Sequence, residues 1–161
     1  MSYCALMLAG LLRASICCVL LAVVWPARVD AMSCTVLSSA SVRYGTYEAF
    51  SAIPLDSAGA ISFRCTSVID GDLVSLQLGR DGSGRFIPRA MRGGDARLEY
   101  NLFLDAARSI VWGDGTSGTS AYTVHPADGQ TVSVPVYGRV WPRQNVPAGT
   151  YDDVVVLTVL Y

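Results

Sequence analysis

Apolar and polar residues alternate along most of the chain after residue 32, in short runs rich in β-branched and aromatic side chains. Glycine, aspartate, serine and proline separate these runs, a pattern typical of strands joined by turns. The clearest strands are predicted at residues 33–38, 61–67, 73–78, 97–104, 131–140 and 150–161, and weaker ones at residues 41–47, 86–91 and 121–125. Only residues 105–108 could form a helical turn. The pattern predicts an all-β, immunoglobulin-like antiparallel β-sandwich without internal repeats.

The last predicted strand, residues 150–161, is apolar on both of its faces. One face would carry Val155, Leu157, Val159 and Tyr161, and the other Val154, Val156 and Leu160. Such a strand needs cover on both sides, yet the sequence stops at Tyr161, and soluble proteins avoid a long apolar edge. We therefore expect either an earlier strand of this chain or a strand of another chain to cover the free edge.

The first 31 residues differ from the rest, since 24 of them are apolar and only Arg13, Arg28 and Asp30 are charged. A positive residue, an apolar run and a small-residue end at Ala31 are typical of a secretory signal peptide. The alternative is a membrane anchor at residues 5–25, which Arg13 in the middle of the run disfavours. We expect a signal peptide at 1–31, a β-sandwich domain at 32–161, and no anchor after cleavage.

Length and charge fit this division into a leader and one domain. The chain has 161 residues, a net charge of −1 and a mean hydropathy of +0.38. A nearly neutral chain without a basic block is not expected to bind nucleic acid. All twelve basic residues are arginines, scattered among acidic residues. This mixture predicts a solvated surface of mixed charge rather than a ligand patch.

Cysteine usage also fits an exported domain. Cleavage would remove Cys4, Cys17 and Cys18 and leave Cys34 and Cys65. Two cysteines in an exported domain are expected to form a disulfide. Closing a loop of about thirty residues would stabilise the fold by roughly 3–4 kcal/mol.

Motifs that resemble chemical sites all have a structural interpretation. Residues 113–118 read Gly-Asp-Gly-Thr-Ser-Gly, but a strand-like segment follows where a phosphate-binding loop needs a helix, so we interpret them as a turn. Residues 70–72 and 81–84 lack the ligand spacing of a calcium loop and are interpreted as hairpin turns. His125 is the only histidine, and no Gly-x-Ser-x-Gly elbow accompanies it. We expect no catalytic residue, cofactor or metal; Trp112 and Trp141 are interpreted as core or loop aromatics.

Several short blocks together resemble the spore coat protein U domain family, which includes the secreted subunits of archaic (Csu-type) chaperone–usher pili. The blocks are Cys34-Thr35-Val36, Tyr44-Gly45-Thr46-Tyr47, residues 59–65, Pro88-Arg89-Ala90-Met91, residues 98–105, residues 112–116, Val136-Tyr137-Gly138-Arg139-Val140 and residues 147–153. The resemblance covers residues 33–161, and its specificity comes from the combination of blocks.

The resemblance implies an immunoglobulin-like fold that lacks its final strand. A periplasmic chaperone would fill the resulting groove first, and the donor strand of a neighbouring pilin would replace it at an outer-membrane usher. By analogy, one wall of the groove is expected at Val154, Val155, Val156, Leu157, Val159 and Tyr161, and the other at the strand beginning near Cys34. The disulfide Cys34–Cys65 would staple that strand to the next. Backbone hydrogen bonds and alternate apolar side chains would hold the donor.

With cleavage after Ala31, only Met32 and Ser33 precede Cys34, which is too short for a donor strand. We therefore expect a secreted structural subunit that accepts a strand at the end of a pilus, as a tip does, after passing through the periplasm to the cell surface. The alternative is a secreted spore-coat or surface-matrix structural protein that no chaperone–usher system polymerises. A third class, a small hydrolase, would need a serine and an aspartate to converge on His125.

Overall fold

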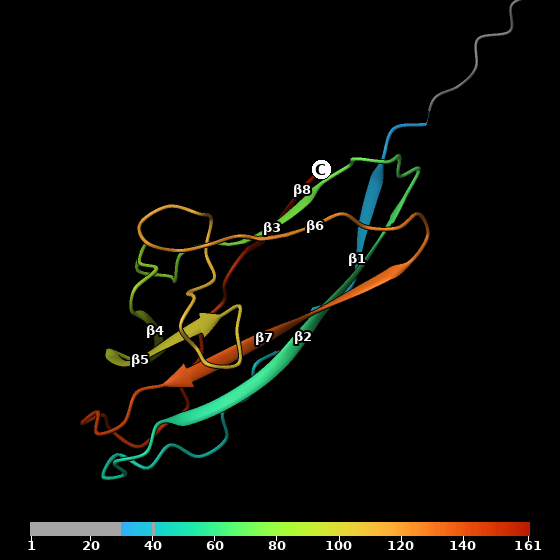
Figure 1. Ribbon diagram of the computed structural model, residues 1–161. Coiled ribbons are helices and arrows are strands. Elements are labelled where there is room, and N and C mark those ends of the chain that lie inside the picture. Colours follow the sequence, from blue (N-terminus) through green and yellow to red (C-terminus); the bar gives the residue numbers. More distant parts are fainter. Residues whose placement is uncertain (1–29, 40) are drawn as a thin grey trace, which may run out of the picture.

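The computed structural model describes residues 30–39 and 41–161, and every regular element in them is a β-strand (Figure 1). The strands are β1 (Ser33–Ser39), β2 (Leu55–Thr66), β3 (Val74–Leu78), β4 (Arg89–Gly93), β5 (Ala96–Phe103), β6 (Tyr122–Val124), β7 (Thr131–Val140) and β8 (Leu157–Leu160). The all-β prediction is confirmed. The predicted leader lies almost wholly outside the described residues. Within the described residues, no helix is long and apolar enough to cross a membrane.

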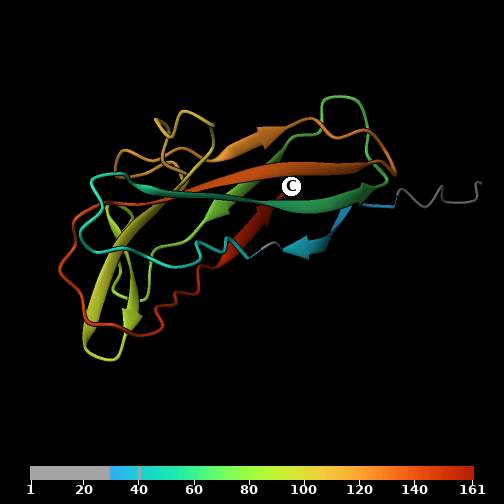
Figure 2. The ribbon, with the colours of Figure 1, turned by 90° about the horizontal axis from the view of Figure 1, so that it is seen from below.

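The strands form two antiparallel sheets that pack against each other (Figure 2). The larger sheet has the order β1-β2-β7-β5-β4 and the smaller one the order β6-β3-β8. The longest pairing joins β2 to β7, from Leu55 opposite Val140 to Arg64 opposite Thr131. This arrangement confirms an immunoglobulin-like sandwich.

Alternation along the strands builds the core between the two sheets. In β7, Val134, Val136 and Val140 are buried while Ser133 and Pro135 are exposed, as expected for a strand with one covered face. The same rule buries Val74, Leu76 and Leu78 of β3, which face the larger sheet across the core. Trp112 is fully buried and its Nε1 donates a 3.0 Å hydrogen bond to the carbonyl of Leu76. The aromatic predicted as a core or loop residue is therefore a core residue.

Four predicted elements differ from the structure. Strand β2 begins at Leu55 rather than at residue 61, because pairing with β7 extends it through a stretch of small and polar residues. Residues 105–108 form a turn, closed by the Arg108 amide donating to the Asp105 carbonyl at 3.0 Å, and no helix. Residues 41–47 and most of 150–156 are not strands, and only Leu157–Leu160 of the last predicted run joins a sheet.

Candidate functional site: a groove between two sheet edges

The first and last strands are both sheet edges. Within the described residues, β1 pairs only with β2 and β8 only with β3, so each has one edge without a strand partner. The segment that follows β1 and the segment that precedes β8 run along the same side of the molecule (Figure 2). An unpaired edge presents a row of free N–H and C=O groups, and here two such edges border one space.

That space is a cavity of about 940 Å³, called the groove below. Its walls are residues 41–47 and 146–157, called the N-terminal and C-terminal walls. Its floor comes from both sheets and is apolar except for one phenol: Ile61, Leu78, Met91, Leu98, Tyr100, Leu102, Val136 and Val140. An apolar floor between two walls that are not regular strands can accept alternate apolar side chains of an extended segment.

At the end of the C-terminal wall, from residue 154 to residue 157, side chains alternate in and out of the groove. Val155 and Leu157 line it, and both pack on the core. Val154 and Val156 point outward, with 81% and 67% of their surface exposed. Of the other residues predicted for this wall, Val159 packs on the core beyond the groove and Tyr161 is 59% exposed.

Backbone and side-chain bonds fix the C-terminal wall to the sandwich. Asp152 and Arg92 exchange backbone hydrogen bonds of 2.8 and 3.1 Å, and the Gly79 amide donates to the Val156 carbonyl at 2.8 Å. The C-terminal wall therefore pairs first with β4 of the larger sheet, and further along the chain with the residue that follows β3 of the smaller sheet. It cannot be a regular strand throughout, because its partner changes along its length.

A buried phenol makes the strongest side-chain contact to this wall. The Tyr100 hydroxyl donates a 2.6 Å hydrogen bond to Asp153 Oδ2. Burial, reinforced by this hydrogen bond, raises the pKa of Tyr100 well above its usual value. The phenol therefore keeps its proton and remains a donor to Asp153.

Residues 41–47, the N-terminal wall, are held by side chains rather than by a backbone ladder. Val42, Tyr44 and Tyr47 pack on the core, and the Tyr47 hydroxyl donates to the Trp141 carbonyl at 3.0 Å. No backbone–backbone hydrogen bond of this wall occurs within the described residues. Gly45 has a positive φ of 77°, and the Arg43 carbonyl accepts a hydrogen bond from the Ser57 hydroxyl. The wall is therefore not a regular strand, and among the described residues neither sheet supplies it with a backbone partner.

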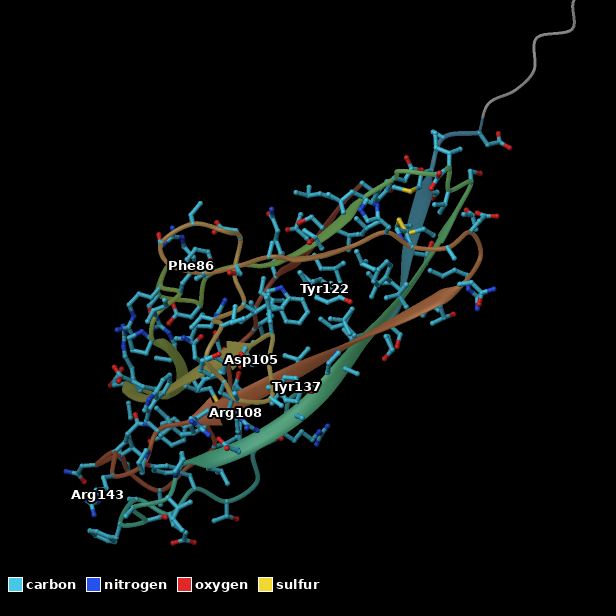
Figure 3. The ribbon with its side chains drawn as sticks, viewed as in Figure 1. Phe86, Asp105, Arg108, Tyr122, Tyr137 and Arg143 are labelled. Atoms are coloured by element: carbon cyan, nitrogen blue, oxygen red, sulfur yellow. A yellow bond between two sulfur atoms is a disulfide. The ribbon has the colours of Figure 1, made fainter. Side chains whose placement is uncertain are left out.

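The predicted disulfide is present at the far end of β1. Cys34 and Cys65 lie opposite each other in the β1–β2 register and their sulfurs are bonded (Figure 3). Cys65 is fully buried. The bond ties the edge strand β1 to β2, which is its only strand partner among the described residues.

The remaining motifs lie away from the groove. Residues 113–118 form an irregular turn with no helix after it, as predicted. In the turn at residues 81–84, Asp81 is buried and accepts hydrogen bonds from the amides of Ser83, Arg85 and Ala90.

His125 Nδ1 lies 2.7 Å from the Asp72 carbonyl oxygen, and no serine hydroxyl in the described residues contacts the ring. The described residues contain no group of three metal-ligating side chains.

Sequence patterns missed the arginine that supports this region. The prediction of a solvated, mixed-charge surface is wrong for Arg89, which is fully buried on β4. Its guanidinium donates to Asn101 Oδ1 at 2.6 Å, to the Gly79 carbonyl at 2.9 Å and to the Trp112 carbonyl at 2.8 Å. In the sequence, the only indication that Arg89 is buried is its position beside Pro88 and two apolar residues.

Fold and groove together define an immunoglobulin-like β-sandwich with an open groove over an apolar floor. The family model of the spore coat protein U domain matches residues 21–158. The chain is 36% identical over 143 residues to Protein U of Myxococcus xanthus, an alignment that covers 80% of this chain and 78% of the relative. The chain therefore belongs to the spore coat protein U domain family.

A solved structure shares the fold. It is the crystal structure of the CsuC–CsuE chaperone–tip adhesion subunit pre-assembly complex from archaic chaperone–usher Csu pili of Acinetobacter baumannii. The TM-score is 0.56, with 20% sequence identity over 81% of this chain. Our chain spans 40% of the length of that solved chain.

Proposed function

We propose that this protein is a secreted structural subunit of a chaperone–usher pilus, and that its groove accepts a β-strand from another chain. One observation carries the proposal: the two strand-patterned segments that find no regular place in a sheet, residues 41–47 and 150–156, are the walls of the same apolar groove. A strand inserted between them would supply backbone partners to the N-terminal wall, and to those backbone groups of the C-terminal wall that do not bond to Arg92 or Gly79.

Binding would follow the rules of β-strand addition. The backbone of the inserted strand forms a ladder with the walls, and its alternate side chains enter the space above Leu78, Met91 and Leu98. The hydrophobic contribution is large, since each buried methylene adds about 0.8 kcal/mol. The disulfide Cys34–Cys65 keeps β1 in place while the groove is empty.

In this proposal a periplasmic chaperone fills the groove during transit, and a neighbouring pilin replaces it at an outer-membrane usher. The family membership and the shared fold with a pilus tip subunit support this assignment. The subunit acts by assembly, and we assign it no catalytic role. If residues 1–31 are the signal peptide, only Met32 and Ser33 precede Cys34. The subunit would then accept a strand without donating one, as a tip does, and mass spectrometry of the exported N-terminus tests this position.

A second candidate is a secreted coat or surface-matrix protein that is not polymerised. The higher identity to Protein U, 36% against 20% for the pilus subunit, favours it. Co-expression with an archaic-type periplasmic chaperone separates the two. A stoichiometric complex supports the pilus subunit, and secretion as a free monomer supports the coat protein.

The groove itself is tested with two neighbouring valines. Val155 faces into the groove and Val154 faces outward. We expect Val155→Asp to weaken binding of a synthetic alternating Val/Thr peptide of about twelve residues by tenfold or more, because a charge would enter an apolar site. Val154→Asp, the matched control, should bind as the wild type does. Equal binding by the two variants, measured by fluorescence anisotropy, would argue against the groove as the acceptor site.

A further inference from the structure

A methionine lies on the apolar floor of the groove. Met91 is on β4 and faces Leu98 across the β4–β5 pair. The next residue along β4, Arg92, pairs with Asp152, so Met91 lies beside the C-terminal wall. Met91 lines the groove and has 8% of its surface exposed. A small oxidant dissolved in water can therefore reach its thioether from the groove, and a strand inserted along this wall would cover it.

Met91 is the only thioether that lines the groove in the described part of the chain. The other described methionine, Met32, packs on the core and does not line the groove. The sulfurs of Cys34 and Cys65 are already joined in a disulfide. If residues 1–31 are the signal peptide, the exported protein keeps Met32 and Met91 as its only methionines. An oxidant that attacks thioethers then has two targets, of which one lies in the groove.

Oxidation would replace an apolar side chain of the floor by a polar one. The sulfur lone pair attacks one oxygen of a peroxide, and the S–O bond forms as the O–O bond breaks. With hydrogen peroxide, the second oxygen leaves as water, so that the sulfur is oxidised by two electrons and the peroxide is reduced. The product is methionine sulfoxide, which methionine sulfoxide reductases return to the thioether.

The tyrosine hydroxyls of the groove are directed away from Met91. Three of the four tyrosines that line the groove already donate: Tyr47 to the Trp141 carbonyl, Tyr100 to Asp153 and Tyr151 to the Pro147 carbonyl. The fourth, Tyr44, meets the ring of Tyr100 edge-on, with centroids 6.1 Å apart. Its hydroxyl lies so close to Gly138 of β7 that a Cβ there would collide with it. Strand β5 separates β7 from β4, a distance of about 10 Å between the two backbones. An inserted strand would therefore bury the sulfoxide oxygen away from these donors.

We propose that Met91 is an oxidation site that peroxides reach while the groove is empty, and that its sulfoxide form binds an inserted strand less tightly. The proposal rests on the proposed function and adds a form of regulation to it. A subunit that meets an oxidant before a partner fills its groove loses acceptor activity, whereas a filled subunit is protected.

The test treats the exported protein with hydrogen peroxide, with and without the alternating Val/Thr peptide at about ten times its Kd. About a tenth of the grooves are then empty, so oxidation of Met91, followed by peptide-mapping mass spectrometry, should slow about tenfold. Met32 is the internal control and should oxidise at the same rate in both samples. The oxidised protein should bind the peptide about tenfold or more weakly in fluorescence anisotropy, since an unpaired polar group is costly to bury.

Two variants assign the loss of affinity to one sulfur. Met91→Leu keeps a side chain of similar volume without an oxidisable atom, and its affinity should be the same before and after peroxide. Met32→Leu should lose affinity on oxidation as the wild type does. Peptide mapping of the wild type needs no variant and decides the question even if Met91→Leu does not fold.

The possible failures are distinguishable. Equal oxidation of Met91 with and without peptide, or unchanged affinity after its oxidation, overturns the proposal about Met91 and leaves the acceptor function intact. No binding of the peptide to the unoxidised wild type overturns both.

Discussion

The Tyr100 hydroxyl lies 2.6 Å from Asp153 Oδ2 and joins the middle of β5 to the C-terminal wall of the groove. The two residues are 53 positions apart in the sequence. Asp153 Oδ1 also accepts a 3.3 Å hydrogen bond from the Gly82 amide. One carboxylate therefore connects three segments: β5, the turn at residues 81–84 and the C-terminal wall.

Tyr100→Phe removes this hydrogen bond and keeps the ring against Tyr44. Because a hydrogen bond to a charged group contributes about 1.5–3 kcal/mol, we expect the free energy of unfolding to fall by roughly 2 kcal/mol. We also expect faster amide hydrogen exchange at residues 152–157, since the wall loses its side-chain anchor. Urea denaturation and exchange mass spectrometry measure the two effects. Tyr122→Phe is the control, and equal exchange in both variants would show that Asp153 does not hold the wall.

Alternation predicts a strand well where one face is buried and the partner strands are regular. Strand β7 agrees with its prediction because Val134 and Val136 face the core while Pro135 faces outward. The first half of β2 was missed since Asp56 and Gly59 have low strand propensity, and only pairing with β7 makes this part a strand. Strand propensity depends on the local sequence, whereas the pairing strand is distant in the sequence.

The disulfide is expected to be the largest single covalent contribution to stability. Replacing both Cys34 and Cys65 by alanine removes a cross-link over a sequence separation of 31. The chain-entropy model gives a loss of roughly 3–4 kcal/mol, and the edge strand β1 should exchange its amides faster than β7. Urea denaturation of the variant against the oxidised wild type measures the loss. A change below about 1 kcal/mol would contradict a stabilising role on this model.

Asp81 should give the fold an acid-sensitive component. Burial raises the pKa of this carboxyl, but hydrogen bonds from Arg85, Ser83 and Ala90 outweigh burial and lower it below its ordinary value of 3.8. A lowered folded pKa stabilises the fold at pH values above 3.8, and this stabilisation is lost as the pH falls through the folded pKa. Asp81→Asn should be less stable than the wild type at neutral pH, with a smaller loss of stability in acid. The free energy of unfolding is measured by urea denaturation at a series of pH values from 7 to about 2. If it falls with the same slope in acid for both proteins, Asp81 does not have this role.

The groove could be predicted only in part. The alternating valines near the C-terminus predicted a strand with an uncovered edge, and the family resemblance implied a groove wall there. Val155 and Leu157 do line the groove. The contact between Tyr44 and Gly138 joins positions far apart in the sequence and depends on a missing side chain, for which no periodicity gives a signal. Pairwise contacts of this kind appear only once the sheets are assembled.

Arg89 is expected to be the most sensitive arginine among the described residues, because its side chain is fully buried and donates hydrogen bonds to three acceptors in three different segments. Arg89→Met fills similar space but leaves the Gly79 and Trp112 carbonyls and Asn101 Oδ1 without this donor. Asn101 Oδ1 still accepts a 3.0 Å hydrogen bond from the Leu102 amide, so two carbonyls lose their side-chain donor. Since each unsatisfied buried group costs about 1–3 kcal/mol, we expect a loss of at least about 2 kcal/mol, measured by urea denaturation, together with a changed near-ultraviolet circular dichroism signal from Trp112. Arg64→Met is the matched control: Arg64 is exposed and, among the described residues, its side chain bonds only to Thr131 Oγ1, so its loss should stay within about 0.5 kcal/mol. Similar losses in the two variants would mean that Arg89 does not organise this part of the core.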